Sequence, residues 1–326
     1  MQIIDELARM PALLYGATLA LGLVVGSFLN VLILRLPRMM EQAWWDDCAE
    51  LTGTGPAAPS GPAVDTPGGT SGNAAGDKVG TPAAGFAHRQ ADSHGKQRLS
   101  LSRPGSHCPH CGHRIRPWEN IPLLSFLLLR GQCSHCGQAI SWRYPLVELG
   151  TALLSLVVVW HFGPTPQAGF ALLLTWGLVA LAVIDADTQL LPDDITLPLL
   201  WLGLLLSLWG VFVDSQSAIL GAVAGYLCLW LVFHLFRVLT GKEGIGRGDF
   251  KLLALFGAWL GWQSLPQILL LSTIPGALFG IALMLTGRSQ RDTPIPFGPF
   301  LALAGWVSLI WGDRIVEAYL RFSGLA

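Results

Sequence analysis

Apolar runs long enough to cross a lipid bilayer recur along the chain, and they restrict the folds open to it. A transmembrane helix needs about 20 mainly apolar residues. Runs close to that length occur at Leu13–Leu34, Leu146–Phe162, Ala168–Ile184, Ile195–Val213, Ala218–Leu239, Phe250–Trp262, Gln267–Thr286 and Phe297–Gly312. Only 13% of the 326 residues are charged, about half the share in soluble domains. The sequence therefore predicts an all-α polytopic membrane protein with about eight transmembrane helices, and it argues against a soluble enzyme.

Two of the runs depart from the usual pattern. The first run follows the segment MQIIDELARM, which carries as much acidic as basic charge, and no small-residue cleavage site closes it. Both features are unlike a secretory signal peptide, so residues 1–37 are expected to contain a retained transmembrane helix. The run Phe250–Trp262 is short and contains Lys251, which makes it the least typical span.

The positions of Lys and Arg orient the predicted helices in the membrane. Counting spans places the segment after the first helix on the same side as the loops at 185–194, 242–249 and 287–296, where basic residues gather. The short loops of the other side, GPTPQ, DSQS and QSLP, contain no Lys or Arg. Because cytoplasmic loops are enriched in these residues, we expect a bacterial inner-membrane protein with periplasmic termini and cytoplasmic polar loops. The lipid bilayer is then a partner, and nothing points to nucleic acid.

Residues 38–145 form the predicted cytoplasmic segment, which divides by composition. Residues 52–97 are rich in Gly, Pro, Ala, Ser and Thr and contain almost no large apolar side chains. Such a stretch cannot bury enough surface to offset the entropy lost on ordering, so we expect a disordered linker. Residues 104–140 hold four cysteines and are predicted to form a small metal-binding subdomain. The seven later helices make up the membrane core, residues 146–326.

The four cysteines have the spacing of a metal site. They form two pairs, Cys108-Pro-His-Cys111 and Cys133-Ser-His-Cys136. Paired C-x2-C motifs at such a separation are typical of a four-thiolate zinc site. The alternatives are four free thiols or two disulfides, and a reducing cytoplasm disfavours disulfides. A shell of four cysteines leaves zinc no open coordination position, which indicates a structural ion whose binding folds the subdomain.

Acidic residues gather in two of the predicted cytoplasmic loops. They are Asp185, Asp187, Asp193, Asp194 and Asp249. Asp193 and Asp194 directly precede a helix, where N-caps are expected, and Asp187 is expected in solvent. Asp185 follows the apolar sequence AVI at a helix end, where the helix dipole disfavours a carboxylate. Asp185 is therefore the strongest candidate for a functional acid in its loop.

Asp249 lies in the glycine-rich sequence GIGRGDFK. Gly246 and Gly248 lack side chains, so they would let a peptide backbone approach the carboxylate, and we predict that they form a substrate loop. The alternative is a flexible loop with Asp249 as the N-cap of the next helix. Ionisable groups near the hydrocarbon core are costly and commonly functional. Two carboxylates at one membrane face indicate acid–base chemistry with a shared proton.

Three other patterns lie within the predicted helices. Gly221-x3-Gly225 and Gly276-x3-Gly280 are predicted to be faces where helices pack closely. Glu148 lies just inside the second helix. It could pair with Arg143 at the membrane interface or contribute to a site.

Taken together, these motifs resemble one family, the bacterial type IV prepilin peptidases, which are leader peptidases and N-methyltransferases. The matching strings extend over most of the chain. Besides the cysteine pairs they are GSFLNVLILRLP at 26–37, WENIPLLSFLLLRGQC at 118–133, RYPLVEL at 143–149, IDADTQLLPD at 184–193, GIGRGDFK at 244–251 and PFGPFLALAG at 296–305. The stretch at 52–97 is longer than the family pattern requires.

The resemblance implies a membrane aspartic protease of the GxGD type, with Asp185 and Asp249 as the catalytic aspartates. It implies that the short basic leader of prepilins and pseudopilins is cleaved after a glycine, at the cytoplasmic face of the membrane. It also implies methylation of the new N-terminal residue with S-adenosylmethionine as the methyl donor. The sequence does not assign the residues that bind this donor.

Two other classes of protein could also contain these acids and cysteines, and they are the alternatives to a peptidase. A proton-coupled transporter also needs acids within the membrane, and it would move a cation or solute without releasing a peptide. A zinc-dependent membrane hydrolase would place the metal near catalysis, so chelation would stop turnover without unfolding. The chain contains no H-E-x-x-H motif that would support such a hydrolase.

Overall fold

A computed structural model describes residues 10–52, 99–103, 105–108, 110–116, 119, 121–241, 246–286 and 296–324. Within these residues the regular structure is helical, and strand-like pairing is limited to two isolated β-bridges. This confirms the predicted all-α class. The predicted linker at 52–97 lies outside the described residues except for its first residue.

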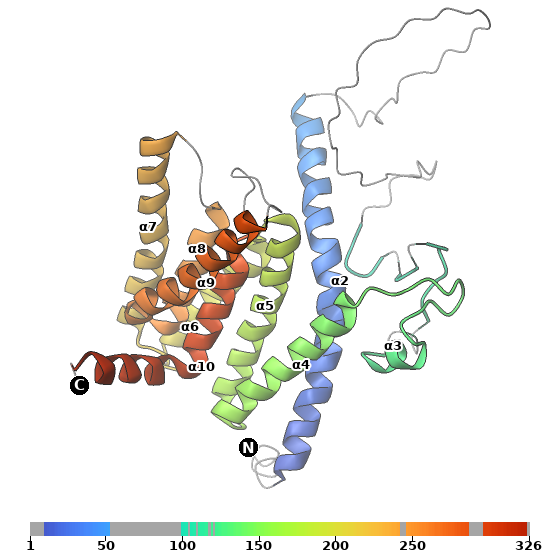
Figure 1. The fold of residues 1–326 in the computed structure, drawn as a ribbon, viewed down its shortest axis with the longest axis horizontal. Coiled ribbons are helices and arrows are strands. Elements are labelled where there is room, and N and C mark those ends of the chain that lie inside the picture. The colour runs from blue at the N-terminus through green and yellow to red at the C-terminus, as the bar shows by residue number, and fades with distance from the viewer. Residues whose placement is uncertain are drawn as a thin grey trace, which may run out of the picture. The chain divides into compact units, whose positions relative to one another are not determined.

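The helices correspond to the eight predicted apolar runs (Figure 1). They are α2 (Pro11–Thr52), α4 (Arg143–Phe162), α5 (Pro166–Thr188), α6 (Asp193–Ser207), α7 (Ser215–Thr240), α8 (Arg247–Leu260), α9 (Leu265–Leu285) and α10 (Gly298–Ser323). A five-residue helix, α3 (Leu124–Leu128), precedes α4, and a 3-10 turn, η2 (Trp262–Ser264), precedes α9. Within the described residues, six helices are long and apolar enough to cross a membrane, whereas α6 and α8 are shorter.

Helix α2 continues through Pro37 to Thr52 without interruption. By internal contacts the chain divides within this helix: residues 1–38 belong with residues 100–326, and residues 39–99 form a separate unit. The other membrane helices and the four cysteines all belong to the first of these units.

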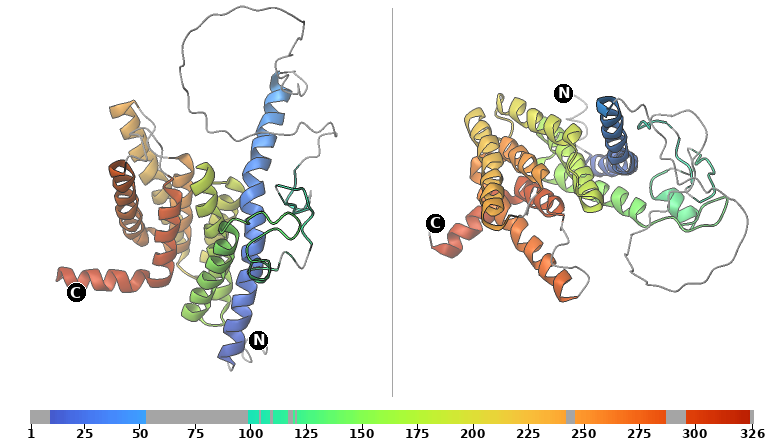
Figure 2. Two further views of the ribbon diagram at one scale, coloured as in Figure 1. Left: turned by 45° about the vertical axis from the view of Figure 1, so that its right-hand side comes forward. Right: turned by 90° about the horizontal axis from the view of Figure 1, so that it is seen from above.

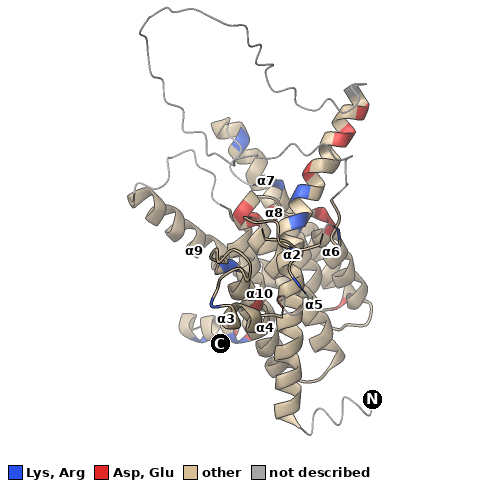
Figure 3. Ribbon diagram, turned by 90° about the vertical axis from the view of Figure 1, so that its right-hand side faces the viewer, with Lys and Arg blue, Asp and Glu red and all other residues tan. Residues whose placement is uncertain are grey.

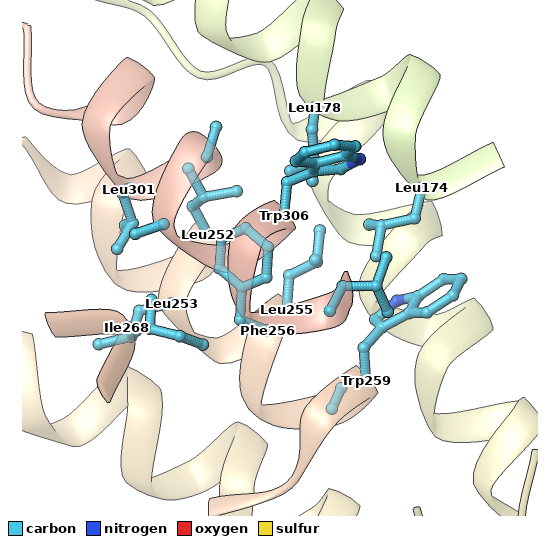
Figure 4. Close-up of a cluster of buried hydrophobic side chains, with 14 of the residues drawn as sticks. Leu174, Leu178, Leu252, Leu253, Leu255, Phe256, Trp259, Ile268, Leu301 and Trp306 are labelled. Carbon is cyan, nitrogen blue, oxygen red and sulfur yellow. The ribbon is translucent and has the colours of Figure 1, made fainter. Parts of the chain in front are cut away.

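The short helix α8 lies at the centre of the hydrophobic core. Every residue from Leu252 to Trp259 is buried, which is the pattern of a helix that is apolar on all sides. Side chains of α5, α6, α7, α9 and α10 belong to the same core cluster, and the examples from α5, α9 and α10 labelled in Figure 4 are Leu174, Leu178, Ile268, Leu301 and Trp306. The run that looked least typical of a span therefore forms the helix with the most complete burial.

Glycines allow α7 to approach α8 until their backbones touch. A Cβ atom on Gly221 would lie 2.3 Å from the carbonyl oxygen of Gly257. A Cβ atom on Gly225 would lie 2.7 Å from the carbonyl oxygen of Leu253. The prediction that Gly221-x3-Gly225 is a close-packing face is therefore confirmed, and small residues at such contacts are typical of membrane helices.

The second predicted glycine face is wrong at Gly276. The atoms nearest to a Cβ at this position belong to the side chains of Phe300 and Phe297, at 3.6 and 3.7 Å. These are ordinary van der Waals distances to aromatic rings, whereas Gly221 faces backbone.

Helix α10 changes direction at Trp311, whose φ of −127° is not helical. Before this point an indole hydrogen bond holds the helix to α5: the Trp306 N–H donates to the Thr175 hydroxyl oxygen at 3.1 Å. After it, the remainder of α10 turns away from the other helices (Figure 1, Figure 2). The predicted apolar run ended at Gly312, so the apolar part of α10 packs in the bundle and the charged part leaves it.

We expect Gly257→Val to destabilise the protein, because its Cβ would lie 2.1 Å from the carbonyl oxygen of Gly221. Overpacking of a core commonly costs about 1–3 kcal/mol, and here the obstacle is backbone. Thermal unfolding in detergent, followed by tryptophan fluorescence, should show a lower midpoint. Gly169→Ala in α5 is the matched control, since nothing lies within 4 Å of its Cβ position. Equal midpoints for the two variants would contradict the close contact.

Candidate functional site

Asp185 and Asp249 come together from different helices. Asp185 lies in the last turn of α5, and Asp249 lies in the first turn of α8. Each residue is only 5% exposed. Asp249 lies outside the six helices that are long enough to span a membrane. Its pKa is raised to about 7, first by burial and second by the negative charge of Asp185. The two carboxylates therefore interact, as the sequence predicted for a pair at one membrane face.

A backbone amide holds the carboxylate of Asp185. The N–H of Gly298, the first residue of α10, donates to Oδ2 of Asp185 at 2.9 Å. A Cβ on Gly298 would lie 2.6 Å from the same oxygen, so this position has no room for a side chain. Sequence reasoning did not assign a role to Gly298. The signal was present in the string PFGPF, where the glycine is the second residue of a predicted apolar helix and is followed by proline.

The two predicted substrate-loop glycines begin α8. Gly246 is the N-cap residue of the helix, and its backbone hydrogen bond to Asp249 partly offsets the rise in the pKa of that carboxyl. Gly248 lies in the first turn, where a Cβ would be 2.7 Å from Cβ of Leu191. Gly248 thus lets the start of α8 touch the connection between α5 and α6. Approach of a substrate to these glycines stays a prediction.

Two of the other acids of the two loops, Asp187 and Asp193, form ion pairs. The prediction that Asp193 caps a helix is wrong, because Pro192 is the N-cap of α6 and both carboxylate oxygens of Asp193 bind Nζ of Lys251 at 2.7 Å. Asp187 is exposed to solvent, as predicted, and it also pairs with the Arg143 guanidinium. Residue preferences at helix starts predicted that Asp193 caps α6, but its carboxylate instead binds Lys251 of the neighbouring helix α8.

In Figure 3 most of the helical ribbon is tan, the colour of residues other than Lys, Arg, Asp and Glu. The two ion pairs join the beginnings and ends of helices near the aspartates. Lys251 connects the start of α8 to the start of α6, and Arg143 connects the start of α4 to the end of α5. They therefore fix the helix ends from which the two buried carboxylates project.

The four cysteines converge, as their spacing predicted. All four Sγ atoms lie within 4.8 Å of one another. Each pair sits in a tight turn of the same design, in which Cys108 and Cys133 each donate their N–H to a carbonyl five residues later, that of His113 at 2.8 Å and that of Gln138 at 2.8 Å. The residue after each second cysteine is a glycine with φ near +69°, at Gly112 and Gly137, a conformation that glycine adopts without strain.

The arrangement of the sulfurs fits a tetrahedral metal ion. Zn–S bonds of about 2.3 Å place two tetrahedral sulfurs about 3.8 Å apart, and the Sγ atoms of Cys108 and Cys136 are separated by 3.9 Å. Backbone hydrogen bonds from Cys111 and His110 lower the pKa of Cys108 to about 6, which favours the thiolate that metals bind. The cluster can therefore bind a metal ion through four sulfur ligands.

Glu148 connects the cysteine segment to the membrane helices. Of the two alternatives that the sequence left open for Glu148, pairing with Arg143 is not observed: its Oε2 accepts the N–H of Leu123 at 2.9 Å, and Arg143 pairs with Asp187. Leu123 has a φ of +55°, which is unusual for a residue with a side chain. On the opposite side, a Cβ on Gly26 of α2 would lie 2.7 Å from Cα of Glu148. Glu148 therefore lies where α2, α4 and the stretch between the two cysteine pairs meet.

Comparison with known proteins places these features in a family. Residues 20–162 match the bacterial peptidase A24 N-terminal domain, and residues 172–281 match the type IV leader peptidase family. The prepilin leader peptidase/N-methyltransferase of Pseudomonas aeruginosa is 50% identical over 324 residues, 99% of each chain. Those of Stutzerimonas stutzeri and Aeromonas salmonicida are 49% and 48% identical, covering 99% and 98% of this chain and 99% of each relative. No solved structure matches, and none of these names supports a transporter.

We expect Asp249→Asn to stabilise the protein increasingly as the pH rises. The pKa of Asp249 is raised from 3.8 to about 7, so the carboxyl contributes most to stability while protonated and loses that contribution between about pH 4 and pH 7. The asparagine side chain at position 249 of the variant does not titrate between about pH 4 and pH 7. The difference in melting temperature, variant minus wild type, should therefore grow over this range and level off above it. A difference in melting temperature that is independent of pH would contradict the burial effect.

We expect Cys136→Ser to lose most of the metal bound by the purified full-length protein, because it removes one of four convergent sulfurs. Elemental mass spectrometry measures the ion content per chain. Cys228→Ser is the control, since Cys228 lies in α7 and is not part of the cluster. Retention of metal by Cys136→Ser at the wild-type level would show that these sulfurs do not form the site.

Proposed function

The chain belongs to the type IV leader peptidase family, and we propose that it removes the short basic leader of type IV prepilins and pseudopilins. We further propose that it methylates the new N-terminal residue, with S-adenosylmethionine supplying the methyl group. The observation that carries the peptidase proposal is the pair of nearly buried aspartates, one from α5 and one from α8. Chemistry at such a pair explains why carboxylates lie among apolar helices.

Asp185 and Asp249 would act as an acid–base pair on the peptide bond. One carboxylate takes a proton from water while the water oxygen attacks the carbonyl carbon. The other carboxyl gives its proton to the amine nitrogen as the carbon–nitrogen bond breaks. This division of labour requires one protonated and one ionised group, which two close carboxylates provide because they do not ionise together easily. The raised pKa of Asp249 supports such a pair.

The glycines that start α8 would form the substrate loop. Gly246 and Gly248 lie three residues and one residue before Asp249 in the sequence, so a peptide backbone lying against them would bring its carbonyl close to the carboxylate. In this proposal the leader and the cleavage position lie at the cytoplasmic face, and the apolar part of the pilin stays in the bilayer.

The metal is proposed to be a structural zinc ion. Four cysteine ligands complete the preferred tetrahedral coordination of zinc and leave no position for a reacting water. Cys108, Cys111, Cys133 and Cys136 would then stabilise a segment that has few buried apolar side chains of its own. The catalytic chemistry would stay with the aspartates.

We propose the bacterial inner membrane as the location, with both termini periplasmic and the two aspartates cytoplasmic. Basic residues beside the aspartates support this orientation. Arg143 begins α4 and pairs with Asp187, which lies two residues after Asp185, and Lys251 lies two residues after Asp249 in the first turns of α8. Cytoplasmic ends of membrane helices are enriched in such residues.

We expect Asp185→Asn and Asp249→Asn each to reduce leader cleavage by at least about a thousandfold, since loss of either partner ends proton transfer in both directions. A model prepilin is incubated with purified protein and S-adenosylmethionine, and mass spectrometry reports the cut position and any added methyl group. Asp194→Asn is the control, because Asp194 is exposed in the first turn of α6. Cleavage at the wild-type rate by either dyad variant would exclude that aspartate from catalysis.

A further inference from the structure

The stretch between the two cysteine pairs presents an apolar surface. From Ile121 to Leu129 the only polar side chain is that of Ser125, and there is no charge. Helix α3 lies in the middle of this stretch. Its side chains at Leu124, Leu127 and Leu128 are 52%, 70% and 75% exposed. A cluster of exposed leucines indicates a surface that binds apolar material.

A hydrogen bond holds this stretch beside the apolar part of α2. The N–H of Leu123 donates to Oε2 of Glu148, the sixth residue of α4, at 2.9 Å. Gly26 of α2 faces the same residue, since its Cβ would lie 2.7 Å from Cα of Glu148. Gly26 is an inner residue of the apolar run Leu13–Leu34. The bond therefore places Leu123 next to a part of α2 that lies inside a membrane.

A second contact with α2 marks the polar edge of the same apolar run. The guanidinium of Arg35, the first charged residue after the run, donates to the carbonyl oxygens of Ser100 and Leu101 at 3.0 and 3.1 Å. Arg35 follows Gly26 by nine residues, which is about 14 Å along a helix. Figure 1 likewise shows α3 level with the N-terminal half of α2. From the edge at Arg35, Leu123 is therefore held about halfway into a hydrocarbon core of roughly 30 Å.

The backbone of this stretch is hydrogen-bonded within the protein, as a position in hydrocarbon requires. The N–H and the hydroxyl of Ser125 both donate to the carbonyl of Ile121, and the carbonyl of Gly131 accepts the N–H of Ile140 at 2.7 Å. The backbone N–H groups that donate to a protein oxygen include those of Leu123, Leu124, Ser125, Leu127, Leu129, Arg130, Gly131 and Gln132. A short helix and its turns satisfied in this way do not need water as a partner.

We propose that residues 121–130 form a re-entrant element, which enters the bilayer between the two cysteine pairs and turns back without crossing it. Its exposed leucines contact lipid acyl chains. The lipid-facing surface of the membrane helices continues this contact, because Val24 of α2 and Leu149 of α4 are also exposed near the same bond. Arg130 ends the element, and its long side chain reaches towards the headgroups. The inference revises the expectation that all of residues 38–145 lie in the cytoplasm, and it does not depend on the proposed peptidase chemistry.

The re-entrant element gives the buried carboxylate of Glu148 a role. An acid within a membrane helix is costly and is kept for a purpose, and here it accepts the amide that begins the element. Leu123 has a φ of +55°, a backbone conformation that costs free energy in a residue with a side chain. A hydrogen bond to a carboxylate away from water is strong enough to offset such a cost. Glu148 is thus the residue that holds the element in place.

The test places the photoreactive residue p-benzoylphenylalanine, which bonds to nearby C–H groups on irradiation, at Leu128 of the full-length protein. The protein is reconstituted in vesicles of palmitoyloleoyl phosphatidylcholine, and mass spectrometry identifies what the probe has joined. Val24 is the lipid-facing reference, and Ser102, exposed beside the Arg35 contact, is the polar reference. A leucine side chain favours apolar surroundings over water by about tenfold or more. We therefore expect the yield of lipid adducts at Leu128 to approach that at Val24 and to exceed that at Ser102 by about tenfold.

Three results would overturn the proposal. A lipid yield at Leu128 no higher than at Ser102 would place the leucines in water. Adducts with peptides of the same chain would show that the protein itself covers them, and adducts between two chains would show an interface between copies. The thermal midpoint and metal content of each variant verify its fold, and the same probe at Leu124 replaces Leu128 if the first variant does not fold. None of these results depends on leader cleavage, so failure of the proposed function would leave the test intact.

Discussion

The backbone contact between α7 and α8 is the interaction on which the arrangement of the aspartates depends. Gly221 and Gly257 let the two helices approach to a distance that a single methyl group would prevent. Helix α8 can then occupy the centre of the core, with side chains buried on every face. Its first turn consequently brings Asp249 to the end of α5, where Asp185 lies. The position of Asp249 thus depends on Gly257, which lies about two helical turns further along α8, and on Gly221 of α7.

The partners of the charged groups explain how two carboxylates remain available to share a proton. Lys251 and Arg143 are held by Asp193 and Asp187. The dyad instead receives backbone N–H groups, from Gly298 to Asp185 and from Gly246 to Asp249. A cation at either carboxylate would favour the ionised state strongly, whereas an amide donor is neutral. The local ion pairs therefore keep positive charge near the dyad without placing it on the dyad.

Features that depend on local sequence were predictable, and features that depend on tertiary partners were not. Eight helices follow from apolar runs, and the convergence of four sulfurs follows from two C-x2-C turns, because both properties arise within short segments. The family resemblance selected Asp185 and Asp249 from five acids. The partner of Asp193 was missed because Lys251 lies 58 residues away, and Gly298 was missed because glycine has no side chain to attract attention.

The shortness of α8 has a consequence for the response of the site to the bilayer. A helix of 14 residues is about 21 Å long, which is less than the roughly 30 Å thickness of a hydrocarbon core. Long helices adjust to thicker or thinner bilayers by tilting, but α8 contacts protein on all sides and has no lipid boundary to match. The depth of Asp249 is therefore set by neighbouring helices, and changes in lipid chain length reach it only through movements of those helices.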